Sequence, residues 1–128
     1  MPLFRTALIA GVLMGAAIGH AAAAGPPATA QTATGEVLVD ARGMTLYTFD
    51  KDADGKSACN GKCAENWPPL KAEGNGRPPA NYSVITRADG TKQWAYKGKP
   101  LYYFAADKKE GDTVGEGKGN GAWHIAKP

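Results

Sequence analysis

The chain has 128 residues, and its 15 lysines and arginines nearly balance its 12 aspartates and glutamates. The formal net charge of +3 is too small to indicate nucleic acid as a partner. The 17 glycines and 9 prolines indicate many turns and short strands. A chain of this length suits one domain with one modest core.

Residues 1–24 have the pattern of a secretory signal peptide. Arg5 gives a positive start, residues 7–18 form an uncharged apolar run, and three alanines at 22–24 supply a small-residue cleavage site. We expect cleavage near Ala24 and a periplasmic or secreted location, with an uncleaved anchor as the alternative. No later segment resembles a transmembrane helix.

The next segment, residues 25–34, is predicted either as a flexible leader or as a weak first strand. Residues 37–39 and 45–49 then predict two strands joined by a turn. Asp40 opens this turn, and Gly43 supplies the left-handed backbone position that such a reversal needs.

Three carboxylates, Asp50, Asp52 and Asp54, alternate ahead of a glycine, as in the first half of a calcium-binding loop. The second half is missing, because Gly61 occupies the position where a bidentate glutamate is expected. The alternative is a polar loop in which Asp52 matches Asp107 as a shared turn-capping residue. We therefore expect no cofactor, with calcium left open.

A short helix is predicted near residues 58–66, and the two prolines that follow Trp67 must end it. In such a helix Cys59 and Cys63 lie one turn apart, close enough for a bridge. Two cysteines in an exported chain most simply form a disulfide bond. A free or metal-bound thiol pair is the alternative.

The second half of the chain predicts a three-stranded meander over residues 83–87, 92–96 and 101–104. Residues 108–121, which are rich in glycine and in alternating charges, predict a long solvated loop. A last short strand is expected at residues 123–125.

One motif occurs twice, about 55 residues apart, which is typical of a structural repeat. Residues 43–52 and 98–107 both read Gly-x-x-Leu-Tyr-x-Phe-x-x-Asp. The register extends in both directions, with one inserted residue downstream, through three matched pairs: Gly35 and Gly90, Gly61 and Gly117, Trp67 and Trp123. We predict two pseudo-symmetric repeats, at about 35–70 and 90–126.

The predicted fold is mainly β: two related antiparallel units, with an approximate twofold between them, form a single domain over residues 35–128. Neither unit is large enough to bury a core alone. Six large rings at matched positions are assigned to the shared core, because repeated rings in a small domain are most often core. They are Tyr47, Phe49, Trp67, Tyr102, Phe104 and Trp123. Tyr103, on the opposite face, is expected to be partly exposed.

The duplicated motif, the block from Ser57 to Leu70 with its two cysteines and Trp-Pro-Pro, and the ending from Gly111 to Trp123 carry a resemblance. Together they resemble a bacterial family of secreted-repeat proteins, often labelled predicted lipoproteins, from Gly35 to the last tryptophan. The resemblance implies an envelope or secreted location and no settled reaction. Many relatives are lipid-anchored, whereas no cysteine near the predicted cleavage site of this chain could accept a lipid.

These observations favour an exported, non-enzymatic envelope protein that acts as a binding or interaction module, with an envelope protein or a small ligand as its partner. The alternative is a periplasmic accessory protein that handles calcium, copper or zinc or performs redox chemistry. It would use the aspartate loop, or Cys59 and Cys63 with His124. No catalytic residue is assigned, because a hydrolytic triad would have to use His124 and no nucleophile motif is present.

Overall fold

The computed structural model describes residues 25–73 and 77–128, so the predicted signal peptide lies outside the described residues. The described part of the chain is mainly β, as predicted, and its elements follow one another in this order: β1 (Ala28–Thr32), β2 (Gly35–Val39), β3 (Tyr47–Phe49), α1 (Lys62–Asn66), β4 (Tyr82–Thr86), β5 (Lys92–Tyr96), β6 (Lys99–Pro100), α2 (Lys118–Gly121) and β7 (Trp123–Ile125).

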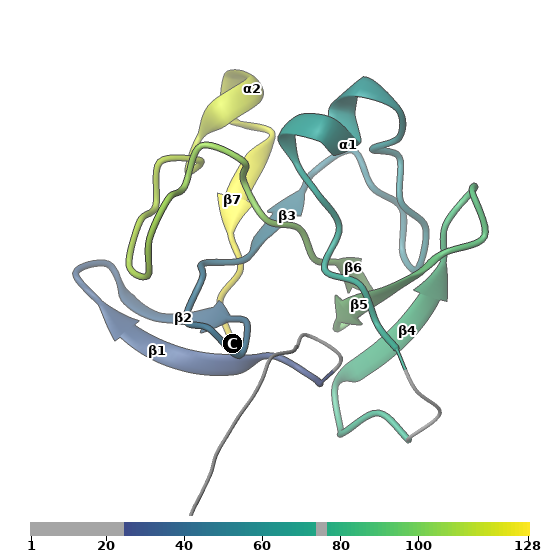
Figure 1. The fold of residues 1–128 in the computed structure, drawn as a ribbon, viewed down its shortest axis with the longest axis horizontal. Helices are drawn as coiled ribbons and strands as arrows, with labels where there is room; N and C mark the ends of the chain where they lie inside the picture. The colour runs from purple at the N-terminus through teal and green to yellow at the C-terminus, as the bar shows by residue number, and fades with distance from the viewer. Residues whose placement is uncertain (1–24, 74–76) are drawn as a thin grey trace, which may run out of the picture.

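The strands form three small antiparallel sheets, ordered β1-β2, β3-β7 and β4-β5-β6 (Figure 1). The segment 28–32, for which the sequence leaves a leader or a strand open, pairs with β2 along its whole length. The tight turn between β5 and β6 has positive φ angles at both Lys97 and Gly98, the geometry of a two-residue hairpin.

The third strand of the predicted meander is displaced. Residues 101–104 do not form it; β6 pairs with β5 instead, through Pro100 opposite Ala95. The N–H of Leu101 still donates to Trp94 of β5 at 3.0 Å. The chain then leaves β5, and Tyr102 forms isolated bridges with Tyr47 and Pro69 of the first repeat. The pairing across the two repeats replaces the local pairing that the sequence pattern predicts.

An approximate twofold axis passes between Tyr47 and Tyr102, the matched tyrosines of the two motifs. The backbone N–H of Tyr47 donates to the carbonyl of Tyr102 at 2.8 Å, and that of Tyr102 donates to Tyr47 at 3.0 Å. A residue that pairs with its own counterpart is the mark of twofold symmetry. The two repeats are therefore joined through equivalent residues, the matched tyrosines.

The two repeats are also interleaved. The N–H of Leu38 in β2 donates to the carbonyl of Ala126, after β7, at 2.9 Å. Its counterpart in β5, Trp94, donates to Leu70, after α1, also at 2.9 Å. Each hairpin thus pairs with the segment that follows the helix of the other repeat. Figure 1 shows α1 and α2 together at one end of the molecule and the β1-β2 and β4-β5 hairpins at the other.

This pairing corrects one part of the sequence register. Leu38 and Trp94 make the matching hydrogen bonds and therefore correspond. Gly35 and Gly90 do not correspond, because their separation in the sequence is one residue shorter than that of Leu38 and Trp94. The second repeat has a longer turn before β5 and a shorter turn after it. The two differences cancel before the tyrosine motif begins.

Four rings stack in one column through the core, in the order Phe49, Trp123, Trp67, Phe104. The two tryptophans are parallel, with ring centroids 3.8 Å apart. Phe49 stacks on Trp123 at 4.1 Å, and Phe104 on Trp67 at 4.2 Å. Each phenylalanine therefore covers the tryptophan of the other repeat. The tryptophans, like Tyr47 and the second tyrosine of the pair, are buried, whereas the phenylalanines at the ends of the column are half-buried.

Strand β2 separates this column from a second apolar cluster. Val37 and Val39 face the aromatic column, and Leu38 faces the second cluster with Leu46 and Leu101. Because successive side chains of a strand point to opposite faces, a strand covered on both sides reads as a continuous apolar run. The sequence Val-Leu-Val meets this requirement.

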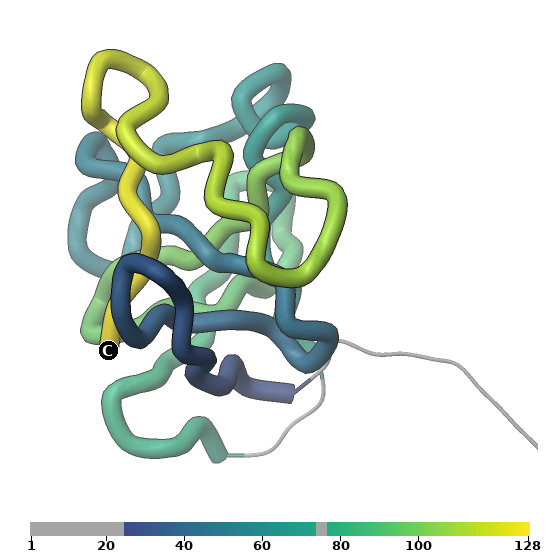
Figure 2. Tube along the Cα trace, turned by 90° about the vertical axis from the view of Figure 1, so that its left-hand side faces the viewer, coloured from purple at the N-terminus to yellow at the C-terminus, as the bar shows by residue number. Residues whose placement is uncertain are grey.

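The end of the chain returns to the first hairpin. Figure 2 shows the C-terminus beside the turn between β1 and β2, and the ammonium of Lys127 donates to the carbonyl of Thr34 at 2.8 Å. In the part of the chain that the structure describes, no helix combines the length and the apolar composition needed to cross a bilayer.

Replacing Trp67 with alanine should lower the free energy of unfolding by about 3–5 kcal/mol, because it removes a buried ring and opens a cavity. Urea denaturation followed by circular dichroism measures the loss. Val114, which is 51% exposed, supplies the control. Val114→Ala should change stability by about 0.5 kcal/mol or less, and an equally small effect of Trp67→Ala would contradict the assignment of this ring to the core.

Candidate functional site

The two cysteines form a disulfide bond, so the alternative of a free or metal-bound thiol pair does not hold in this structure. The loop that contains Cys59 is held from the other repeat by Arg87. This arginine exposes only 6% of its surface. Its guanidinium donates to the carbonyl of Cys59 at 2.6 Å and to the amide oxygen of Gln93 at 2.7 Å. The sequence analysis missed this buried arginine, because its position at the end of a strand reads as solvent-facing.

The aspartate of each repeated motif accepts a hydrogen bond from the tyrosine of the other repeat. The hydroxyl of Tyr47 donates to Asp107 at 2.7 Å. The hydroxyl of Tyr102 donates to Asp52, also at 2.7 Å. Burial, followed by the hydrogen bond to the carboxylate, raises the pKa of Tyr47 well above its usual value. For the other tyrosine burial again comes first in raising the pKa, and the carboxylate adds to it. Both hydroxyls therefore remain donors.

The same aspartates fasten the loops that follow them. Asp52 accepts the backbone N–H of Ala58 at 2.6 Å, and Asp107 accepts that of Val114 at 2.9 Å. Gly115, next in the second loop, has no room for a side chain, because a Cβ there would lie 2.9 Å from the rings of Tyr47 and Trp67. The motif aspartates thus cap loops and join the repeats.

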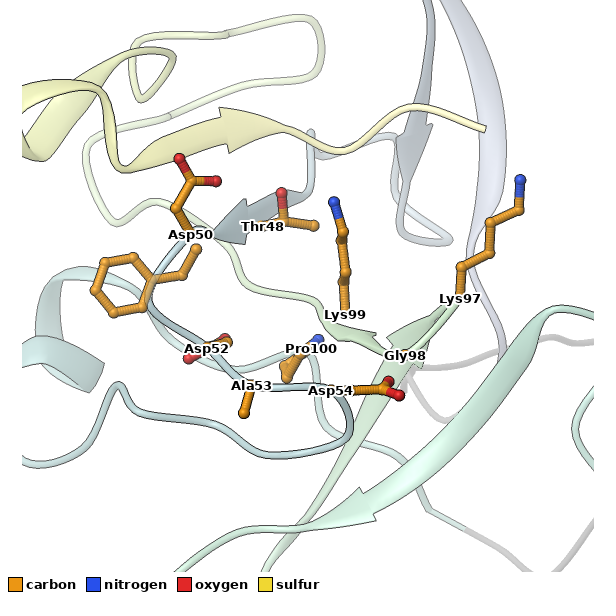
Figure 3. Close-up of a pocket in the computed structure, with 10 residues that line it drawn as sticks. Thr48, Asp50, Asp52, Ala53, Asp54, Lys97, Gly98, Lys99 and Pro100 are labelled. Carbon is orange, nitrogen blue, oxygen red and sulfur yellow. The ribbon is translucent and has the colours of Figure 1, made fainter.

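The three aspartates of the predicted calcium loop do not converge. Asp52 is engaged by a tyrosine and a backbone N–H, Asp50 lies 2.9 Å from the imidazole of His124, and Asp54 lies against Gly98. Figure 3 shows the carboxylates of Asp50 and Asp54 pointing in different directions. Among residues 25–73 and 77–128, no three acidic, histidine or cysteine side chains are arranged to hold a metal ion. Calcium binding stays a prediction.

A groove lies between the aspartate loop and the β5-β6 turn. It consists of two adjoining cavities of about 280 and 330 Å³, which share Thr48, Asp50, Lys97 and Lys99. In Figure 3 the side chain of Lys99 extends toward Thr48, and that of Lys97 rises beside it. The larger cavity continues toward the C-terminus and is also lined by Tyr96, His124 and Lys127.

The larger cavity of the groove carries a surplus of positive charge, because three lysines and one aspartate line it. None of these lysines forms a salt bridge within the described residues, whereas Asp50 is paired with His124. Asp52 and Asp54 line only the smaller cavity. The second ring nitrogen of His124 lies 3.3 Å from Glu116. The hydrogen bond to Asp50, with a further contribution from Glu116, raises the pKa of His124 above its ordinary value, although partial burial opposes the shift.

The sequence analysis missed these lysines, because lysine beside a glycine turn reads as an ordinary solvated surface. His124 lies in β7 opposite Thr48 of β3. This pairing places the imidazole at the rim of the groove. The larger cavity offers three ammonium groups, an imidazole and a threonine hydroxyl beside one carboxylate, a set suited to holding an anionic group.

Replacing Tyr102 with phenylalanine should lower stability by about 1.5–3 kcal/mol, because a partly buried hydrogen bond to a carboxylate is lost while the ring is kept. Tyr82→Phe is the matched control, since the hydroxyl of Tyr82 has no partner within the described residues. Urea unfolding at neutral pH compares the two variants. Equal losses in both would show that the contact with Asp52 contributes nothing.

An NMR titration of the imidazole should give His124 a pKa above that of a free histidine. Asp50→Asn should move this pKa back toward the ordinary value, and Glu116→Gln should move it less, because Asp50 makes the larger contribution. The stability that the charged imidazole adds is fully present below the pKa of the unfolded chain. It is lost as pH rises through the folded pKa. An unchanged pKa in Asp50→Asn would contradict the pairing.

Comparison with curated proteins and with solved structures gave no match. A family model described as a secreted repeat of unknown function matches residues 28–71 and again residues 83–127. The two matches coincide with the two structural repeats, and each contains one copy of the tyrosine motif and one tryptophan of the stacked aromatic column. They confirm the resemblance seen in the sequence: the chain belongs to the family of secreted repeats of unknown function.

Proposed function

We propose that this protein is an exported, non-enzymatic binding module whose ligand occupies the groove between the aspartate loop and the β5-β6 turn. The observation that carries the proposal is that some polar groups are paired within the protein, whereas the lysines of the groove are not. The motif tyrosines and aspartates bond to one another across the dyad, and the cysteines are joined. The lysines of the groove, by contrast, have no acidic partner within the described residues.

The chemistry of the groove supports recognition better than turnover. Its only imidazole is held between two carboxylates, and the groove lacks the ordered nucleophile, base and orienting group of a hydrolytic site within the described residues. A cavity of a few hundred Å³ with a few convergent polar groups has the size of a small-molecule site. No specific observation favours the metal-handling or redox alternative.

We further propose that the protein works in the periplasm or outside the cell after cleavage near Ala24. The description of the family as secreted supports export. A disulfide bond between Cys59 and Cys63 also suits an oxidising compartment. The ligand would then be a component of the cell envelope or a solute that reaches it.

The test is an NMR titration of the ¹⁵N-labelled exported protein with soluble fractions of an envelope digest, separated into saccharides and peptides. At least one fraction should shift the backbone signals of Thr48, Asp50, Lys97 and Lys99. The signals of the cavity formed by Lys71 to Glu73 and Gly90 to Lys92 serve as the internal control and should stay in place. Shifts confined to that control region, or none with any fraction, would contradict the proposed function.

A further inference from the structure

We infer that the larger cavity of the groove is a vacant ring position of the duplicated fold, and that it binds a six-membered ring that bears a carboxylate. This inference rests on the proposed function, because it concerns the same groove, and it names the class of ligand. The two halves of the molecule share one backbone arrangement, and a ring fills a position in one half that is open in the other.

Tyr103 fills this position in one half. It follows the motif tyrosine Tyr102, and its counterpart in the other half is Thr48, which follows Tyr47. The half-buried ring of Tyr103 reaches the turn after β2, where its hydroxyl donates to Asp40 at 2.6 Å. The guanidinium of Arg42 lies 5.6 Å from the ring centre.

The backbone hydrogen bonds identify the matching residues in the other half. Asp40 N–H donates to the carbonyl of Met44 at 3.0 Å across the first turn. In the second repeat Tyr96 pairs with Lys99 across the shorter turn. Tyr96 therefore stands where Asp40 stands, and Lys99 stands where Met44 stands.

Both turns are fixed to the dyad in the same way. Leu46 N–H donates to Leu38 at 3.1 Å, and Leu101 N–H donates to Trp94 at 3.0 Å. The surroundings of Tyr103 and the lining of the larger cavity thus occupy equivalent positions in the two halves.

The difference between the versions is the side chain that should fill the space. A threonine is too short to reach the turn, and the larger cavity, of about 330 Å³, lies where Thr48, Tyr96 and Lys99 meet. Its other walls are apolar in part, since Ile125 and Ala126 contribute to them. The place that holds a tyrosine ring in one half is therefore open in the other, and a ring-shaped ligand fits it.

The polar partners indicate what the ring carries. In the filled half a carboxylate, Asp40, accepts the hydroxyl of Tyr103. In the open half Tyr96 stands in place of that acceptor. The charge there is positive, because Lys99 stands in place of Met44 and Lys97 lies in the adjoining turn.

The third lysine of this cavity, Lys127, also donates to the carbonyl of Thr34, and Lys97 lies 5.3 Å from the ring centre of Tyr96. The carboxylate of Asp50 at the rim is matched by His124, which leaves the surplus positive. The exchange of an acceptor for ammonium donors calls for a ligand that brings the anion, and a carboxylate on the ring satisfies several ammonium donors at once.

Such a ring has two sources: an aromatic acid or an acidic sugar of the envelope. 4-Hydroxybenzoate and glucuronate are the probes, and p-cresol and glucose are their uncharged counterparts. Isothermal titration calorimetry with the exported protein at low salt should show binding by at least one acid. Its uncharged counterpart should bind at least about tenfold more weakly, the effect of losing a charged hydrogen bond of about 1.5–3 kcal/mol. The acid that binds identifies the source.

Three variants test the position of binding. Thr48→Tyr supplies the ring that the other half already has, so it should abolish binding while the melting temperature stays level or rises. Lys99→Met restores the counterpart residue and should weaken binding about tenfold. Lys62→Met removes an exposed lysine in α1 and should leave binding unchanged.

Undiminished binding by a folded Thr48→Tyr or by Lys99→Met would overturn the inference, and so would equal binding of an acid and its uncharged counterpart. If neither acid binds while an envelope fraction still shifts the signals of the groove, the inference fails and the proposed function stands. If no envelope fraction shifts those signals, the proposed function itself fails.

Discussion

The backbone bridge between Tyr47 and Tyr102 is the contact on which the rest of the structure depends. Since a residue faces its own counterpart there, the contacts of the repeated motif are made twice, once in each direction. The tyrosine hydroxyls reach the aspartates of the opposite repeats, and the tryptophans lie on one another along the same axis. The tyrosine and aspartate of the motif are therefore two ends of a contact that only a second copy completes, which explains why they recur together.

This symmetry separates structural residues from those left available for recognition. Where the two halves agree, the side chains are buried and bonded to one another, as Tyr47 and Tyr102 are. Where they differ, at Thr48 against Tyr103, the first half leaves space beside the lysines of the β5-β6 turn. A duplicated fold can lose a ring at one of its two equivalent positions because the column of four stacked rings lies elsewhere and continues to supply the buried apolar area.

Much of the fold follows from the sequence, because the signals are local. Alternating apolar residues predict the hairpins, and the duplicated motif predicts the dyad. The contacts that failed to appear in the sequence analysis are long-range. Nothing near residues 101–104 shows that Tyr102 will leave its own hairpin for Tyr47, and nothing near Arg87 shows that it will be buried against the disulfide loop. The lysines of the groove can be interpreted as ligand-binding residues only after comparison with the other half, where Tyr103 fills the equivalent position.

The interleaving of the repeats determines when the chain can fold. The backbone partner of Leu38 in the first hairpin is Ala126, which follows β7. The second tryptophan of the column, Trp123, lies in β7. Contacts between residues so distant in sequence form slowly, because the intervening chain must close a large loop first. A polypeptide that leaves the cytoplasm N-terminus first would thus complete its core only after β7 and Ala126 have followed the first repeat.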